Sequence, residues 1–343
     1  MKEVRLLYRK LVLLILSTFA LLLFLFISGR YLNSDSLPPT NDALVETVSI
    51  WQPKNVLSEL SSMPPLVKQG YFLITETSKN MGPMVSDTAK QFTGNNLACT
   101  NCHLRAGTQA GSASWVGVTD RFPQFGGRSN TIGTIEDRIN GCIERSMNGK
   151  KLPLESNEIK AIVAYMEWLG EGLPEERKKE FKGYAPIKIP DTAVNLEKGK
   201  AVYTQECALC HRENGEGIRH VDASKGYQYP PLWGADSYND GAGMNRVITS
   251  AEFIKGNMPF GQATWDNPKL TDEQAFNVAG YINSFDRPKK KNKENDYPDK
   301  KLKPVSTPYG PWVDDFPKEQ HKYGPFLPII SHYKENYNII KTK

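Results

Sequence analysis

The hydrophobic pattern of the chain begins with one uncharged apolar stretch, from Leu11 to Gly29, composed almost entirely of Leu, Ile, Val, Phe and Ala. As a helix rising about 1.5 Å per residue it would span roughly 28 Å, close to the ~30 Å hydrocarbon core of a membrane. We therefore predict a helix over residues 1–30, followed by a polar tether over 31–50. Basic residues precede this helix and only Arg30 follows it closely, which places the N-terminus in the cytoplasm and the rest of the chain outside.

A cleaved secretory signal is the alternative to a membrane anchor. Signal peptides usually carry an apolar region of about 7–15 residues that ends in a small-x-small cleavage site. The stretch here is longer, and Ser28-Gly29-Arg30 fits such a site poorly. The sequence favours an uncleaved anchor in the cytoplasmic membrane, with the remaining chain on its periplasmic face.

Helical periodicity recurs in two similar blocks further along the chain. In the first block a capping box at Thr134 and Asp137 precedes an apolar run, and a second amphipathic stretch follows over 156–169. In the second block a helical stretch over 196–203 opens and one over 271–285 closes, and we expect the Pro- and Gly-rich residues between them to form loops. Because the blocks share one plan and carry little strand pattern, the sequence predicts an all-α protein with two tandem domains.

These patterns also place the domain boundaries. We expect a first domain over 51–172, a linker rich in Glu, Lys and Pro over 173–190, a second domain over 191–286 and a tail over 287–343. The tail opens with a run of lysines and lacks periodicity, as solvated, disordered chains do. Its many aromatic residues indicate instead an irregular strap that packs onto the domains.

Composition and charge exclude one class of partner. Hydrophobic residues make up 39% of the 343 and charged residues 24%, as in ordinary globular domains. The net charge of +5 is small and dispersed, and no nucleic-acid-binding motif is present. We therefore expect no nucleic acid as a partner.

The candidate chemistry lies in the five cysteines. Four of them form two C-x-x-C pairs, each followed at once by histidine: Cys99-Thr100-Asn101-Cys102-His103 and Cys207-Ala208-Leu209-Cys210-His211. This spacing is the attachment signature of c-type haem, in which both thiols form thioethers with the haem and the histidine ligates the iron. A redox disulfide would not require the histidine. We predict two covalently bound haem c groups in two cytochrome c-like domains, with His103 and His211 as iron ligands.

The sequence offers several candidates for the sixth ligand of each iron. In the second domain Met258, just before a proline, stands where small cytochromes place a thioether ligand, and Met244 and Lys255 are lesser candidates. In the first domain the equivalent region offers Cys142 and Met147.

Cys142 is the unpaired fifth cysteine, which marks a reactive or ligating thiol. A plain buried thiol is the alternative. On a helix, Cys142 would share one face with Arg138, Arg145 and Ser146, and nearby cations lower the pKa of a thiol. Some of these cations could serve haem propionates instead, and we expect that at least one does.

The residues around Cys142, Arg138-Ile139-Asn140-Gly141-Cys142-Ile143-Glu144-Arg145-Ser146-Met147-Asn148-Gly149, resemble the di-haem thiosulfate dehydrogenases, which form tetrathionate. The resemblance extends through both haem motifs and Phe253-Ile254-Lys255-Gly256-Asn257-Met258-Pro259. It continues in the tail, at Asp296-Tyr297-Pro298-Asp299 and Pro308-Tyr309-Gly310-Pro311, and covers roughly residues 50–328.

The resemblance implies that Cys142 is the distal ligand of the first haem, opposite His103, and that this haem is the active site. Arg128, Arg138 and Ser146 match family positions around the substrate anion. The second haem, ligated by His211 and Met258, would pass electrons to a small cytochrome c or a terminal oxidase. In some relatives a lysine directly before the methionine can exchange as ligand, and Asn257 at that position puts this exchange in doubt.

The expected activity is therefore the oxidation of two thiosulfate ions to tetrathionate, which can also run in reverse. We hypothesise that Cys142 leaves the iron and forms a sulfur–sulfur bond with one thiosulfate, which the second thiosulfate then attacks. Because two dianions repel each other, the site needs fixed cations such as arginine. A membrane-tethered electron carrier without substrate chemistry is the main alternative, and a haem-based sensor is another.

Overall fold

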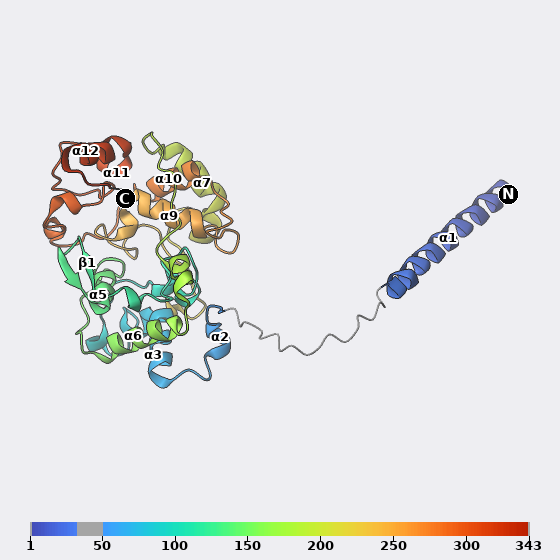
Figure 1. The fold of residues 1–343 in the computed structure, drawn as a ribbon, viewed down its shortest axis with the longest axis horizontal. Helices are drawn as coiled ribbons and strands as arrows, with labels where there is room; N and C mark the ends of the chain where they lie inside the picture. Colours follow the sequence, from blue (N-terminus) through green and yellow to red (C-terminus); the bar gives the residue numbers. More distant parts are fainter. Residues whose placement is uncertain (1, 33–50, 342–343) are drawn as a thin grey trace. The chain divides into compact units, whose positions relative to one another are not determined.

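The N-terminal apolar stretch forms one long helix in the computed structural model, which describes residues 2–32 and 51–341 (Figure 1). Helix α1 (Lys2–Leu32) contains a span from Arg9 to Ser28 whose length and mean hydropathy of 2.9 suit a membrane helix or a signal sequence. Most of the expected tether, residues 33–50, lies outside the described residues. Helix α1 and the part from Trp51 onward are separate units, each described by itself.

The first haem domain is built on the crossing of two helices, α3 (Pro65–Thr75) and α6 (Asn157–Gly170). They approach so closely at Gly70 that a Cβ atom there would lie 2.0 Å from the carbonyl oxygen of Ala161. Any larger side chain would therefore separate the helices. The short helices α2 (Val56–Glu59) and α4 (Thr77–Met81) flank this crossing.

The second domain repeats this plan. Helix α7 (Leu196–Glu206) crosses α10 (Asp272–Ile282), and a Cβ atom on Gly199 would lie 2.2 Å from the carbonyl oxygen of Asn277. The predicted helices over 156–169, 196–203 and 271–285 are confirmed within a few residues. The short helix α8 (Ala208–His211) follows α7 and carries the end of the second haem motif. A further helix of this domain, α9 (Val247–Asn257), lies in a region where we expected loops.

Helix α9 escaped prediction because it is buried on nearly every side. Ten of its eleven residues are buried, so it has no polar face that could produce a helical period in the sequence. It packs against α10 and ends directly at Met258. The chain thus presents Met258 from the end of a rigid element.

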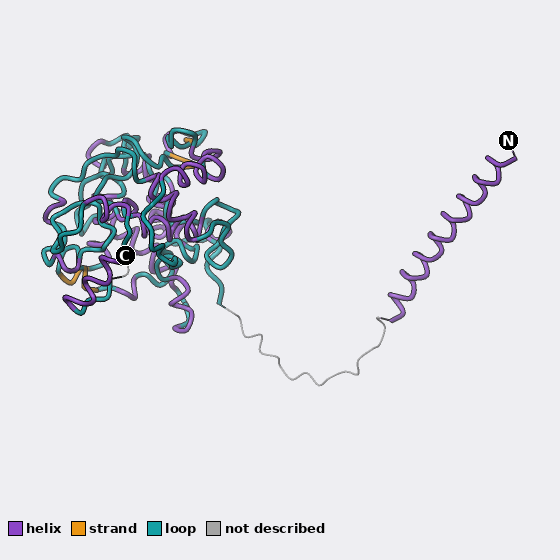
Figure 2. Tube along the Cα trace, turned by 90° about the horizontal axis from the view of Figure 1, so that it is seen from above, coloured by secondary structure: helices purple, strands orange, loops and turns teal. Residues whose placement is uncertain are grey.

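Strands are confined to two short hairpins within the described residues (Figure 2). Strand β1 (Gln124–Gly126) pairs antiparallel with β2 (Thr131–Gly133), and β3 (Ile218–Arg219) pairs antiparallel with β4 (Tyr227–Tyr229). The expected all-α class with two tandem domains is confirmed. Between the α-helices run short 3₁₀ helices: Thr88–Lys90, Cys99–Asn101, Arg105–Gly107, Thr119–Arg121, Glu175–Phe181, Ala223–Lys225, Gly243–Asn245, Lys293–Asn295 and Lys300–Leu302.

The tail packs against the folded domains, and the disordered alternative for it is wrong. After an irregular course it ends in helices α11 (Lys318–Tyr323) and α12 (Leu327–Tyr337), which the sequence pattern did not predict. Phe326 is fully buried, and its ring meets Phe276 of α10 edge to face with 5.9 Å between centroids. The tail therefore adds apolar core to the second domain.

Candidate functional site

The first haem motif and the unpaired cysteine line the same cavity. Helix α5 (Ile135–Arg145) begins at the predicted capping box, in which the Thr134 hydroxyl accepts from the Asp137 amide and the Asp137 carboxylate accepts from the Thr134 amide. The helix carries Cys142 into the cavity that the haem motif also lines. The predicted residues that line the cavity together are Cys99, Cys102, His103, Arg138, Cys142 and Ser146.

His103 is oriented by the loop that follows it. Its Nδ1 lies 2.9 Å from the carbonyl oxygen of Ala113, to which it donates in the tautomer that leaves Nε2 free as a ligand. The ring also packs on Trp115, with 4.9 Å between centroids. These contacts aim the free nitrogen into the cavity, as a metal-ligating histidine requires.

Cys142 differs electrostatically from the motif cysteines. Burial raises the pKa of the Cys99 and Cys102 thiols to about 12. Burial also raises the pKa of Cys142, but the charge of Arg138, a hydrogen bond with His103 and the charge of Arg128 lower it more, to about 6. The surroundings of Cys142 thus favour its thiolate form beside His103, whereas burial favours the neutral thiol at the motif cysteines.

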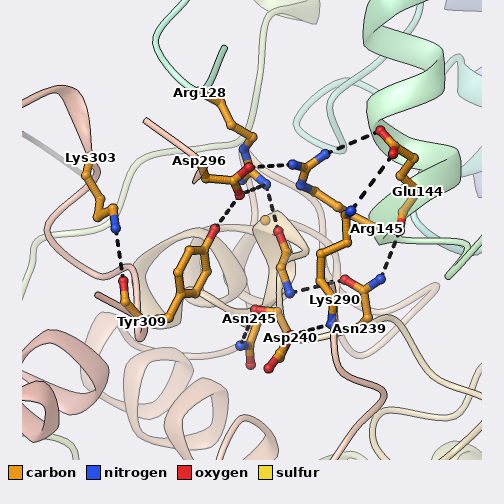
Figure 3. A network of polar contacts seen from close by, with 12 residues as sticks. Arg128, Glu144, Arg145, Asn239, Asp240, Asn245, Lys290, Asp296, Lys303 and Tyr309 are labelled. Carbon is orange, nitrogen blue, oxygen red and sulfur yellow. Dashed lines mark hydrogen bonds and ion pairs between the residues drawn. The ribbon is translucent and has the colours of Figure 1, made fainter. Parts of the chain in front are cut away.

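Arg128 reaches the site from a different element. It lies in the turn of the β1–β2 hairpin and does not line the cavity itself. Its Nη1 donates to the carbonyl oxygen of Gly241 over 2.7 Å and lies 3.4 Å from Oδ2 of Asp296 (Figure 3). Its charge still acts on Cys142.

The expected shared face of α5 is realised only in part. Arg138, Cys142 and Ser146, spaced four residues apart, face the cavity. Arg145 turns away, and its Nη2 donates to Oδ1 of Asp296 over 2.6 Å (Figure 3). Arg145 therefore contacts the tail rather than the cavity.

The second motif lines a second cavity together with Met258. The Nδ1 of His211 lies 2.8 Å from the carbonyl oxygen of Pro230, which repeats the orientation of His103. Lys255, a lesser ligand candidate, is paired with Asp272. Met147, the other candidate in the first domain, is 3% exposed in the core of that domain, where it also borders the first cavity.

The residues of both cavities fit a c-type haem. Each cavity brings together two thiols for attachment, an imidazole nitrogen left free by a backbone hydrogen bond, and a sulfur atom from a later segment. The two cavities share part of their lining, namely Leu97, Cys102, Tyr238 and Met244. Two groups bound there would therefore lie next to each other across the domain boundary.

The linker contributes to the first cavity, which the sequence did not indicate. Lys182 and Gly183 line it, and the carbonyl oxygen of Gly183 accepts from the amide of Ala113 over 2.9 Å. Tyr184 follows, its hydroxyl 4.0 Å from the sulfur of Met244. No motif marks these residues, because their position depends on how the linker folds back over the haem loop.

Comparison with known proteins agrees with this architecture. Residues 88–174 match the SoxA/TsdA cytochrome c domain family, and residues 196–286 match the cytochrome c family. The chain is 42% identical to the thiosulfate dehydrogenase of Psychrobacter arcticus over 60% of its own length and 61% of the relative's. The chain is also 40% identical to the thiosulfate dehydrogenase of Allochromatium vinosum, over 60% of this chain and 76% of that relative.

A solved structure shows the same fold. The chain superposes on the thiosulfate dehydrogenase (TsdBA) of Marichromatium purpuratum with a TM-score of 0.59 and 32% identity, covering 75% of this chain and 50% of the other. The match thus spans half of that longer chain and less than two thirds of the Psychrobacter relative. The two cytochrome c domains carry two covalently bound c-type haems. The chain belongs to the thiosulfate dehydrogenase family of di-haem cytochromes c.

Proposed function

We propose that this protein oxidises two thiosulfate ions to tetrathionate at the first cavity and passes the two electrons onward through the second. The observation that carries the proposal is the placement of Cys142: it faces His103 and is flanked by Arg138 and Ser146, with the charge of Arg128 nearby. A protein that only relays electrons needs neither a free thiol nor, in this cavity, an arginine such as Arg138 that lacks an ion-pair partner among the described residues. The relatives named thiosulfate dehydrogenase support the same reaction.

The chain supplies four ligands for the two irons in this proposal. His103 and Cys142 would hold the first iron, and His211 and Met258 the second. When bound, each haem iron can take up one electron, so the pair matches the two electrons that the reaction releases. A thiolate donates strongly and lowers the potential of its iron, whereas a thioether raises it, so the ligand sets favour electron flow from the first cavity to the second.

The arginines bind and orient the substrate anions. Arg138 lines the cavity and forms no ion pair with any residue in the described part of the chain, so its guanidinium is available to a sulfonate group. Arg128 adds a second positive charge from the hairpin. These charges offset the repulsion between two dianions brought into one cavity.

The sulfur chemistry takes place at Cys142. The thiolate and the terminal sulfur of the first thiosulfate form a sulfur–sulfur bond, and two electrons are released. The terminal sulfur of the second thiosulfate then attacks the sulfur that the first one contributed. The bond to Cys142 breaks, the thiolate leaves with its electron pair, and tetrathionate departs as a dianion.

The second cavity would provide the exit for electrons. Met258 and Phe260 line it, and Phe260 is half exposed, so this cavity approaches the protein surface. We infer a small cytochrome c or a terminal oxidase as electron acceptor. Helix α1 would hold the protein at the periplasmic face of the cytoplasmic membrane, or serve as a signal sequence if it is cleaved.

A stoichiometric assay of the purified holoprotein tests this proposal. With ferricyanide as acceptor, thiosulfate should be consumed and two ferricyanide ions reduced for each tetrathionate formed. Haem reduction by thiosulfate without tetrathionate would favour the electron-carrier alternative. Absence of any reaction with thiosulfate would contradict the proposal.

A further inference from the structure

Asp296 of the tail joins two elements of the proposed substrate site. Its Oδ1 accepts from Arg145 at the end of α5 over 2.6 Å, and its Oδ2 lies 3.4 Å from Nη1 of Arg128 in the hairpin turn (Figure 3). The hydroxyl of Tyr309 donates to the same Oδ2 over 2.7 Å. The Asp296 side chain is only 8% exposed, so these contacts form largely away from water.

The hairpin cannot hold Arg128 in place by itself. Its strands have three residues each, and the side chains of Phe125 and Ile132 are 56% and 74% exposed. An isolated two-stranded hairpin without a covered apolar face is at best marginally stable in water. The position of Arg128 must therefore be fixed by contacts outside the hairpin.

The tail supplies those contacts. The amide of Tyr297 donates to the carbonyl oxygen of Arg128 over 2.8 Å, and the guanidinium lies over the Tyr297 ring, 5.5 Å from its centroid. A Cβ atom on Gly127, next to Arg128, would lie 3.3 Å from Cβ of Leu302, so the tail also packs against the turn. Together with Asp296, these contacts hold both the backbone and the side chain of Arg128.

The geometry leaves Arg128 able to attract an anion. The carboxylate lies closer to Arg145 than to Arg128, and it balances one of the two guanidinium charges. The contacts of Arg128 with Asp296 and with the Gly241 carbonyl both use Nη1. One edge of the guanidinium is therefore anchored, while the group keeps its charge.

We propose that Asp296 is a positioning residue, which anchors Arg128 and Arg145 so that the charge of Arg128 is held beside the first cavity, which Gln124 of the same hairpin lines, and attracts thiosulfate into it. This inference rests on the proposed function. Asp296 does not touch the reacting atoms, and it acts through the two arginines. The C-terminal strap is thereby part of the substrate site as well as of the fold.

Asp296→Asn distinguishes a positioning role from a purely electrostatic one, because the two roles predict opposite changes in the KM for thiosulfate. The substitution removes a negative charge near the substrate site, which by itself would lower the KM for a dianion. It also replaces one carboxylate oxygen with an NH₂ group that cannot accept a hydrogen bond from an arginine. If positioning dominates, the KM for thiosulfate rises by about tenfold, the size expected for a charge-assisted hydrogen bond.

Asp314→Asn is the matched control. Asp314 is a buried carboxylate of the same tail, and it accepts hydrogen bonds from His321 over 2.8 Å and from the hydroxyl of Tyr333 over 2.5 Å. It has no contact with Arg128 or Arg145. The control therefore makes the same chemical change in a similar environment, and its KM should match that of the parent protein.

The experiment compares the parent and both variants as full-length holoproteins with equal haem content. It measures kcat and KM for thiosulfate, the Tm, and the binding of tetrathionate to the oxidised protein by titration calorimetry. The Kd for tetrathionate is measured without turnover. We expect it to rise about as much as the KM for thiosulfate in Asp296→Asn and to stay unchanged in Asp314→Asn. A KM for Asp296→Asn that is unchanged, lowered or equal to that of Asp314→Asn overturns the inference.

Two further outcomes of this experiment lead to different conclusions. If Asp296→Asn does not fold or loses haem, Tyr309→Phe removes one hydrogen bond to the carboxylate and keeps its charge. A KM raised by about twofold to threefold then supports the inference, and an unchanged KM overturns it. If the parent protein neither binds tetrathionate nor oxidises thiosulfate, the proposed function fails and this inference fails with it.

Discussion

Gln109 donates a hydrogen bond to Asn257 across the boundary between the two cytochrome c domains, with 2.7 Å between Nε2 and Oδ1. Gln109 lies in the loop after His103, and Asn257 immediately precedes Met258. The Nδ2 of Asn257 also donates to the carbonyl oxygen of Gly111 over 2.9 Å, and Asn257 is fully buried. The proximal loop of the first haem motif therefore supports the segment that presents Met258.

We predict that Gln109→Ala loosens this segment. The loss of one hydrogen bond, worth about 1 kcal/mol, leaves the buried amide of Asn257 without a partner on one side. Weaker ligation by Met258 should lower the potential of the second haem, which spectroelectrochemical titration measures. Gln262→Ala is the control and should leave both potentials unchanged, because this site is exposed and, among residues 2–32 and 51–341, the side chain accepts only from Lys269. A shift of equal size in the two variants would contradict the prediction.

Lys255 should not serve as a haem ligand, because its ammonium group is paired with Asp272. We expect Lys255→Ala to leave the absorption spectrum and the potential of the second haem unchanged. Met258→Ala should lower that potential, because it removes the thioether that favours ferrous iron. A spectral change in Lys255→Ala under turnover would show that lysine takes part in ligation.

Arg138→Gln should weaken substrate binding strongly. The guanidinium lines the first cavity without an ion-pair partner in the described part of the chain. Loss of a charge-assisted hydrogen bond predicts a KM for thiosulfate raised by about tenfold or more, with both haems retained. Arg177→Gln is the control, because Arg177 pairs with Glu180 and does not line the cavity. Steady-state kinetics with an unchanged KM for Arg138→Gln would remove this residue from the substrate site.

The tail should make a pH-dependent contribution to stability through Asp314. Burial acts to raise the pKa of Asp314, but hydrogen bonds from Tyr333 and His321 lower it more, to below its ordinary value. The resulting stabilisation is present above the unfolded-state pKa of about 3.9 and is lost as the pH falls through the lower folded-state pKa. Tyr333→Phe should therefore lower the Tm at neutral pH, and the difference from the parent should shrink in acid. A pH-independent difference would contradict this assignment.

The sequence predicts the haem chemistry well because that chemistry is local. Cys99, Cys102 and His103 must be adjacent in the chain to attach and ligate one haem, so their spacing is visible without a structure. Helix α5 can be predicted in the same way, because its capping box and its apolar spacing lie within one short segment. The position of Cys142 opposite His103, by contrast, is implied only by the resemblance to the thiosulfate dehydrogenases, because helix periodicity relates Cys142 to Arg138 and not to a residue outside the helix.

Contacts between distant segments leave no such pattern. Arg128 and Asp296 are 168 residues apart, and nothing in either neighbourhood indicates that a tail carboxylate meets a hairpin arginine. Helix α9 is buried all round and so lacks the polar face that reveals other helices. Lys182 belongs to a segment whose composition is that of a linker, although it lines the first cavity.

Tetrathionate formation by Cys142→Gly holoprotein tests the proposed chemistry most directly, with haem content and the absorption spectrum measured on the same sample. We predict that both haems remain attached through the two motifs, that the spectrum of the first haem changes, and that kcat/KM for thiosulfate falls by at least about a hundredfold. Cys142→Met should likewise keep its haems and lose most turnover. Full tetrathionate formation by a Cys142→Gly protein that retains both haems would contradict the role proposed for this thiol.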